Sequence, residues 1–226
     1  DAISNLFMGT LRTANKLIII GAAGYVFYLA ETRFALWRMD AESPITWIFA
    51  FVIYDFFYYW FHRISHERQI FWASHAAHHQ SEDYNLSTAL RQTGTGAFVS
   101  WVFYIPMFLI GIPSYVFISV ASLNLVYQFW VHSEHIPKLG WYENYFVTAS
   151  NHRVHHAQNE QYIDKNYGGV FIIWDRMFGT HKIEDENEAC IYGIRSTLNT
   201  FNPVWANLHI YVKIIKEMWL SKKWKD

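Results

Sequence analysis

Apolar and polar positions alternate along this chain in long blocks. Four blocks are continuous enough to predict membrane-spanning helices, over about residues 14–30, 45–61, 97–112 and 114–131. A span needs roughly 20 apolar residues, so a buried core helix is the competing interpretation for the first and shortest block. After the fourth block the chain becomes polar and aromatic. The pattern therefore predicts an all-α integral membrane protein with about four transmembrane helices.

Local signals mark the ends of these segments. Ser43 followed by Pro44 fits a helix start, with serine as the N-cap and proline at the first helical position. The run 111–113 (Gly-Ile-Pro) predicts a tight turn that joins the third and fourth segments into a hairpin. A fifth, amphipathic helix is predicted over about 203–220, on the membrane or on the domain surface, with basic residues near its end at Lys213, Lys216, Lys222 and Lys223.

Two apolar segments carry polar side chains. Asp55 is the one charge in the second segment, and it lies seven residues before His62, on the same helical face. Because a charge at membrane depth is costly, we expect Asp55 to face an interior network, and we expect this helix to continue beyond the bilayer. In the fourth segment Asn124, Gln128 and His132 form a stripe at i, i+4 and i+8. The stripe favours either helix–helix hydrogen bonding or a face turned toward a metal site.

Composition supports a membrane protein and excludes one class of partner. Hydrophobic residues make up 52% of the 226 residues and aromatic residues 19%, whereas charged residues make up only 16%. The net charge of −1 leaves no basic excess for nucleic acid. A single cysteine, Cys190, rules out an intramolecular disulfide. No linker divides the chain, so residues 1–226 are predicted to form one domain. The sequence starts at Asp1 and shows no signal-peptide pattern. Whether further residues precede Asp1 is left open.

Histidines are the main chemical signal. Nine of the twelve are candidate metal ligands, because they recur at i, i+3 and i+4 spacings or end the polar stripe. Neutral imidazole binds iron, zinc and copper, and one tetrahedral zinc would need only four ligands. The count therefore favours a dinuclear site, with iron preferred for oxygen chemistry. The nine are His62, His66, His75, His78, His79, His132, His152, His155 and His156.

Other polar residues near these histidines have two interpretations each. Glu67 and Glu134 are candidates to accept imidazole N–H groups, or are plain surface charges. Asn151 is a similar candidate or, slightly favoured, a helix N-cap. The remaining histidines, at positions 135, 181 and 209, are left unassigned. The polar regions 62–96 and 132–200 are predicted to form a histidine-rich cap. Arg63 and Arg68 favour the cytoplasmic side for it, against Arg33 and Arg38 in the opposite loop.

The motifs HRISH, HAAHH and NHRVHH, set among short apolar segments, resemble those of the fatty acid hydroxylase superfamily of membrane di-iron oxygenases. The resemblance covers roughly residues 43–209. Longer stretches such as DFFYYWFHRISHE and NHRVHHAQNEQYIDKNYGGVFIIWDRMFGT are most similar to its alkylglycerol monooxygenase branch and bacterial relatives. The resemblance implies that the eight motif histidines and His132 hold two iron ions, and it matches Glu67 to an acidic residue of that branch.

The resemblance also implies a function. The expected activity is O2-dependent hydroxylation of a C–H bond in a sterol, a fatty acyl chain or an alkylglycerol ether lipid. No flavin or nicotinamide motif is present, so electrons are expected from an external donor of cytochrome b5 type or ferredoxin type, or from tetrahydrobiopterin. A lipid or sterol desaturase is the alternative on the same site. A non-enzymatic membrane protein that binds or transports a metal is the alternative from another class.

Overall fold

A computed structural model describes residues 2–221, and within that range the regular structure is helical, without strands. Two isolated bridges, between Phe146 and Phe171 and between Ala157 and Tyr192, are the extended pairings in this range. Lys222 and Lys223 of the predicted basic end lie outside the described residues. The α-helices are α1 (Ala2–Arg33), α2 (Pro44–Glu67), α3 (Gln69–Trp72), α4 (Ala76–His79), α5 (Ile105–Ile110), α6 (Ser114–Trp130), α7 (Ala149–His156), α8 (Ile173–Phe178) and α9 (Pro203–Leu220).

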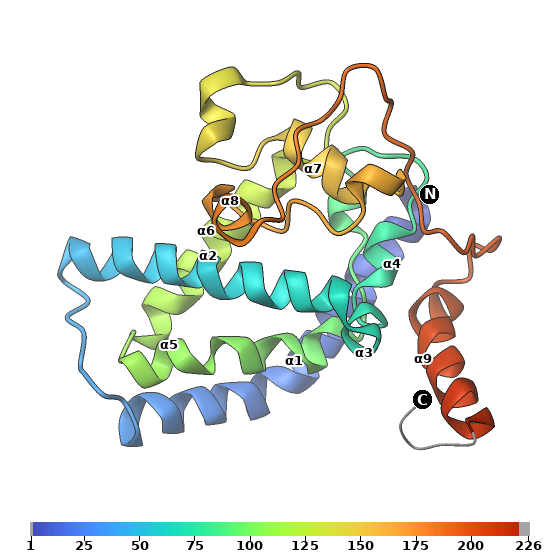
Figure 1. Ribbon diagram of the computed structural model, residues 1–226. Coiled ribbons are helices and arrows are strands. Elements are labelled where there is room, and N and C mark those ends of the chain that lie inside the picture. The colour runs from blue at the N-terminus through green and yellow to red at the C-terminus, as the bar shows by residue number, and fades with distance from the viewer. Residues whose placement is uncertain (1, 222–226) are drawn as a thin grey trace.

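Helix α2 occupies the middle of the molecule (Figure 1). Helices α1 and α5 lie on one side of it, and α7 and α8 lie on the other, while α6 packs directly against it. Helix α9 stands at one end and contacts α1, α3 and α4. This arrangement separates an apolar layer, formed by α1, α2, α5 and α6, from a polar layer of short helices and loops.

Two of the described helices, α1 and α2, are long and apolar enough to cross a membrane, judged by length and composition. Both extend beyond the predicted spans of 14–30 and 45–61. Many apolar side chains on these helices and on α6 lie open to the surroundings, which is unusual for a protein surface in water. Examples are Leu17, Ile18, Ile48, Ile118 and Val126, each more than half exposed.

The third predicted segment is not one helix. Residues 97–112 form two 3₁₀ turns, Gly96–Phe98 and Ser100–Tyr104, and then α5. Pro106 lies in the first turn of α5, where its missing N–H breaks no helical hydrogen bond. A proline here is compatible with a new helix start but not with the interior of a 16-residue helix. The apolar segment 97–112 is therefore built from short helical pieces, and its predicted membrane passage stays a prediction.

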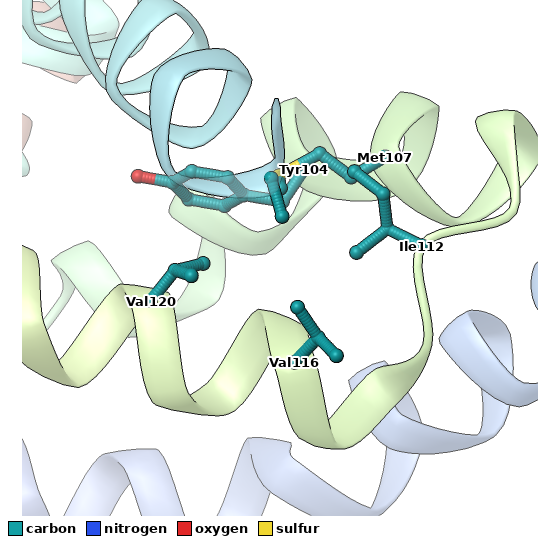
Figure 2. Close-up of a cluster of buried hydrophobic side chains, with 6 residues drawn as sticks. Tyr104, Met107, Ile112, Val116 and Val120 are labelled. Carbon is teal, nitrogen blue, oxygen red and sulfur yellow. The ribbon is translucent and has the colours of Figure 1, made fainter. Parts of the chain in front are cut away.

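The hairpin of α5 and α6 packs on α2 through a small apolar core. Figure 2 shows its side chains, of which Met107 and Ile112 face Val116 and Val120 across the turn. Tyr104 packs at the edge of this cluster, with its hydroxyl directed away from Met107 and Ile112. Ala50 of α2 completes the cluster, and its small side chain permits close approach of the helices.

The hairpin turn depends on Gly111. Its φ of 103° lies in the left-handed region, and a Cβ added there would come within 2.0 Å of the carbonyl oxygen of Trp37. The segment that leaves α1 also binds this turn, since Leu36 N donates to Leu109 O at 2.8 Å and Met39 N donates to Gly111 O at 3.2 Å. The turn therefore joins α1, α5 and α6 through main-chain contacts.

We predict that Gly111→Ala lowers the free energy of unfolding by about 2–4 kcal/mol, from left-handed strain together with the backbone clash. Thermal unfolding of the purified protein in detergent measures this loss. Gly179→Ala is the matched control, because Gly179 has a φ of 75° with nothing within 4 Å of an added Cβ. Equal losses of melting temperature in the two variants would show that the contact with Trp37 is unimportant.

Candidate metal centre

Nine histidines from four parts of the chain converge where the apolar and polar layers meet. They are all buried or half-buried, and they form two sets whose ligand atoms lie within 4.8 Å of one another. The set of five contains His62, His66, His75, His79 and His155. The set of four contains His78, His132, His152 and His156. These are the nine histidines that the sequence singled out as candidate ligands.

The division between the sets follows helical geometry rather than the sequence motifs. Each i, i+4 pair stays together: His62 with His66, His75 with His79, and His152 with His156. The histidine at i+3 goes to the opposite set, as His78 and His155 show. Adjacent helical residues point about 100° apart, so α4 and α7 each present histidines to both sets. Three histidines at i, i+3 and i+4 therefore do not all belong to one set.

Ring nitrogens within each set point at one another. In the set of five, His75 Nε2 lies 3.1 Å from His62 Nε2 and 3.2 Å from His79 Nε2. In the set of four, His132 Nε2 lies 3.0 Å from His152 Nε2 and 3.4 Å from His78 Nε2. A metal–nitrogen bond of about 2.1 Å would hold two ligand nitrogens about 3.0 Å apart at a right angle and about 3.4 Å apart in a tetrahedron. The observed separations fit ligands of a shared metal ion.

Main-chain carbonyls fix the tautomers of four of these rings. The Nδ1 atoms of His62, His78, His132 and His155 lie 2.8–3.0 Å from the carbonyl oxygens of Tyr167, Arg91, Gln128 and Lys165, respectively. A carbonyl oxygen only accepts, so each Nδ1 carries the proton and each Nε2 keeps its lone pair. His78 and His132 therefore face each other with two lone pairs at 3.4 Å, which is not a hydrogen bond. A cation between them would satisfy both.

Burial keeps the candidate histidines that lie outside α2 in the neutral form, which is the form that binds metal ions. Desolvation lowers the pKa of His78 to about 4 and the pKa of His132 to about 3. Desolvation, followed by repulsion from neighbouring imidazoles, holds the pKa of His75, His79, His152, His155 and His156 well below the usual value. Neutral imidazole is the ligand form at physiological pH.

Several of the convergent nitrogens have no partner among residues 2–221. The Nε2 atoms of His66, His155 and His156 and the Nδ1 atom of His152 are buried without a hydrogen bond. An unpaired buried nitrogen costs free energy, and so many in one place is unusual for a folded protein. The donor set therefore fits metal ions, and an all-nitrogen set suits iron, zinc or copper.

A buried carboxylate joins the apolar helices to this site. Asp55 is fully buried on α2 and accepts four hydrogen bonds, of 2.7–3.0 Å, which matches the expected interior network. Asn124 of α6 donates one, and the others come from the N–H groups of Val170 and Phe171 and the ring N–H of Trp174. Asp55 thus binds both α6 and the segment before α8.

The segment bound by Asp55 also reaches the histidines. Its Tyr167 supplies the carbonyl that binds His62 Nδ1, and the Tyr167 ring lies 5.3 Å from the His66 ring. Asp175 holds the same segment from the other side, since its carboxylate accepts from the N–H groups of Tyr167 and Gly168. Burial raises the pKa of Asp175 to about 6. Asp55 therefore positions His62 through the segment 167–171.

The polar stripe on α6 forms the expected helix–helix hydrogen bonds and ends at a candidate ligand. Asn124 forms a helix–helix hydrogen bond to Asp55, and Gln128 donates to Asn124. His132, at the end of the stripe, belongs to the set of four.

The other candidates lie away from the ring nitrogens. Glu67 forms an ion pair with Arg63 at 2.7 Å on the surface, and Glu134 is exposed beside Tyr192. Asn151 is not the N-cap of α7, because Thr148 takes that position; Asn151 lies three residues on and its side chain accepts from Thr148 N. His135 is exposed, whereas His181 and His209 are half-buried outside both sets.

The sequence analysis missed two contributions to the site. The carbonyls that orient the histidines belong to residues of unremarkable type, because any residue supplies a carbonyl. Arg153, within NHRVHH, forms a two-pronged ion pair with Glu184 at 2.6–2.7 Å and donates to the carbonyls of Ser133 and Ile136. An arginine between ligands of α7 could have suggested such an anchor, since bidentate pairs fix geometry.

We predict that Asp55→Asn destabilises the protein by about 3–5 kcal/mol, because an amide N–H would replace one acceptor oxygen and face donors. Thermal unfolding and the metal content after purification should both fall. Glu160→Gln is the control, since the exposed ion pair of Glu160 with Arg195 contributes only about 0.2–1 kcal/mol. A stable, metal-replete Asp55→Asn variant would contradict the role of the carboxylate.

Comparison with known proteins places the chain in a family. The fatty acid hydroxylase family profile matches residues 47–180. The chain is 45% identical over 223 residues to human alkylglycerol monooxygenase, which covers 98% of this chain and 49% of that protein. It is 37% identical over 209 residues to the Caenorhabditis elegans alkylglycerol monooxygenase, with 92% and 41% covered.

A bacterial relative, the ornithine lipid hydroxylase OlsE of Rhizobium tropici, is 29% identical over 185 residues, with 76% of this chain and 55% of that protein covered. No solved structure matches. The chain spans about half the length of the curated relatives named here. The family profile covers more than half of the chain and confirms the resemblance of the histidine motifs, so this chain belongs to the fatty acid hydroxylase family.

Proposed function

We propose that this protein is a membrane-bound di-iron oxygenase that uses O2 to hydroxylate a C–H bond of a lipid. The observation that carries the proposal is the pair of histidine sets, five and four, with converging unpaired nitrogens. Two iron ions would use all nine ligands, whereas one zinc ion would use four. When bound, the iron pair supplies the redox chemistry that activates O2.

The chain's own residues would orient the metal site and keep it dry. Carbonyls at positions 91, 128, 165 and 167 hold four rings in one tautomer. Such outer contacts raise the basicity of the ligating nitrogen and fix the ring plane. Burial of the histidines excludes bulk water from the site. A water-poor site favours oxidation of a C–H bond over side reactions of the activated oxygen.

Polar side chains line α2 directly below the histidines. Tyr54, Tyr58 and His62 share one face at i, i+4 and i+8. The Tyr58 ring lies 5.3 Å from the His62 ring, and the Tyr54 ring stacks on Tyr104 at 4.8 Å. The approach to the site from the apolar layer is therefore lined by hydroxyl-bearing rings.

A positive charge also faces this approach. Arg12 lies on the face of α1 that carries the buried Asn5 and Met8, and its charge acts on Tyr54 and Tyr58 as well as on His75 and His78. Among residues 2–221 no hydrogen bond or ion pair joins Arg12 to another residue. A hydrocarbon chain alone would leave this guanidinium unpaired, whereas an oxygen-bearing lipid group would pair with it. We infer that oxidation occurs at a carbon close to the polar end of the lipid.

The names of the relatives support a lipid substrate of this kind. Several relatives are alkylglycerol monooxygenases, and one bacterial relative is an ornithine lipid hydroxylase. For an ether lipid, hydroxylation of the ether carbon would give an unstable product that separates into an aldehyde and an alcohol. Electrons would come from an external donor of cytochrome b5 type or ferredoxin type, or from tetrahydrobiopterin.

We further propose that α1, α2, the segment 97–112 and α6 form four membrane passages, with the metal cap in the cytoplasm and Glu67, Glu134 and Asn151 in supporting roles. The exposed apolar side chains of α1, α2 and α6 support the membrane contact. A metal transporter would need ligands spaced along a path, whereas here they are gathered in two sets. A desaturase would use the same ligands and differs only in product.

The two sets make a sharp prediction about adjacent histidines. His155→Ala removes a nitrogen from the set of five and His156→Ala removes one from the set of four. The iron content of each variant should fall from two ions per chain to about one, and its Mössbauer spectrum should lose the spin coupling of an iron pair. His135→Ala, at an exposed histidine, is the control. One zinc ion or a haem in the purified wild-type protein would refute the di-iron site.

We predict that the iron-loaded, reduced protein inserts one atom of ¹⁸O₂ into an alkylglycerol and releases a fatty aldehyde, detected by mass spectrometry. A free alkane of equal length, which lacks a polar end, should react at least about tenfold more slowly. Arg12→Met should raise KM for the ether lipid while iron content stays normal. Oxygen insertion far along the chain would contradict oxidation at the polar end, and a C=C product without ¹⁸O would identify a desaturase.

A further inference from the structure

Two stacked tyrosines connect the set of four to the surface. The ring of the buried Tyr84 stacks on that of His132 with centroids 5.8 Å apart, and lies 5.2 Å from the His156 ring. On its other side Tyr84 stacks on Tyr192, with centroids 4.6 Å apart and planes inclined by 14°. Tyr192 is half-buried in a loop, next to Ile191, which is 58% exposed.

The stack is fixed to the candidate ligands at both ends. The Tyr84 hydroxyl donates to the carbonyl of Val131, the residue before His132, at 3.1 Å. Tyr192 pairs in a bridge with Ala157, the residue after His156, and its carbonyl accepts from Gln158 at 2.9 Å. The rings therefore keep their spacing to the histidines and are not loose surface residues.

The site needs electrons that the chain does not itself supply, and these must pass through the protein shell. We propose that they enter at Tyr192 and pass through the Tyr84 ring to His132 and His156. This inference rests on the proposed di-iron function. A one-electron donor is oxidised at the surface, and each electron that arrives reduces one ferric ion to ferrous. The tyrosines provide contact between π-systems and are not themselves oxidised or reduced.

The surroundings of Tyr192 suit the approach of a cationic reductant. The negative charge of Glu134 acts on Tyr192, and the Glu82 side chain lies beside Gly193, where an added Cβ would meet it at 3.2 Å. Arg153 contributes no free positive charge here, because it is paired with Glu184. Carboxylates at the rim raise the local concentration of cations and speed encounter.

A second aromatic contact offers a competing route. Trp72 lies 5.1 Å from the His66 ring and 5.6 Å from the His79 ring, both in the set of five. Trp72, however, belongs to the apolar cluster that joins α3 to α9, with Tyr211 and Ile214 packed alongside. Trp72 and Tyr192 are both half-buried, so exposure does not separate the two routes. The carboxylates beside Tyr192 favour that entry point for a cationic reductant.

The test is anaerobic stopped-flow reduction of the diferric protein by the methyl viologen radical cation, followed by optical and Mössbauer spectra. Tyr84→Leu and Tyr192→Leu should each slow reduction on the order of tenfold, because the contact between rings is lost. Tyr84→Phe and Tyr192→Phe keep the rings and should match the wild type. Trp72→Leu should also match it. After full chemical reduction, the Leu variants should complete a single turnover with O2 and lipid at the wild-type rate.

The outcomes separate this inference from the proposed function. Wild-type-like reduction in both Leu variants, or slow reduction in Trp72→Leu alone, overturns the tyrosine route while the di-iron function stands. A wild-type protein without reducible iron overturns both. If the Tyr84→Leu variant loses metal, the Tyr192→Leu variant decides, because the half-buried Tyr192 stacks on Tyr84 and not on a histidine. Slow reduction of the Tyr192→Leu variant supports the route, and normal reduction overturns it.

Discussion

The buried carboxylate of Asp55 is the interaction on which the geometry of the site depends. A charge inside an apolar helical layer carries a large desolvation cost, and four hydrogen bonds offset it. The donors come from α6, from the segment before α8 and from α8 itself, so one side chain joins the apolar layer to the polar one. The same segment returns a carbonyl to His62, seven residues along α2. Asp55 therefore fixes the position of the apolar helices relative to the candidate ligand His62.

Sequence patterns predicted those features that arise from local periodicity. The apolar run and the Ser-Pro start located α2, and α9 begins and ends at the predicted residues 203 and 220. The nine histidines were recognisable because i, i+4 spacing places two ligands on one helical face. Pro106 marks the start of α5 within the segment 97–112.

The remaining features depend on how distant segments meet. Helical spacing separates His78 from His75 and His79, but which histidines of other elements join each set depends on how α2, α4 and α7 meet, and no spacing rule encodes that. The stack of Tyr84 and Tyr192 joins residues more than a hundred positions apart. Asn151 was expected at the N-cap of α7 but lies three residues after it, as the second residue of a capping box. Both positions of the box accept polar residues of the same kinds, so the sequence did not distinguish them.

The carbonyls that orient the histidines have a consequence for how this site tolerates sequence change. Where a carboxylate side chain orients a ligand, one substitution removes the contact. Here the acceptors are main-chain oxygens of Arg91, Gln128, Lys165 and Tyr167, which every substitution retains. The orientation of these four rings therefore depends on the path of the backbone and not on which side chain each acceptor residue carries. A substitution at one of these positions would act through the packing of its side chain, and the carbonyl would still be there to orient the candidate ligand.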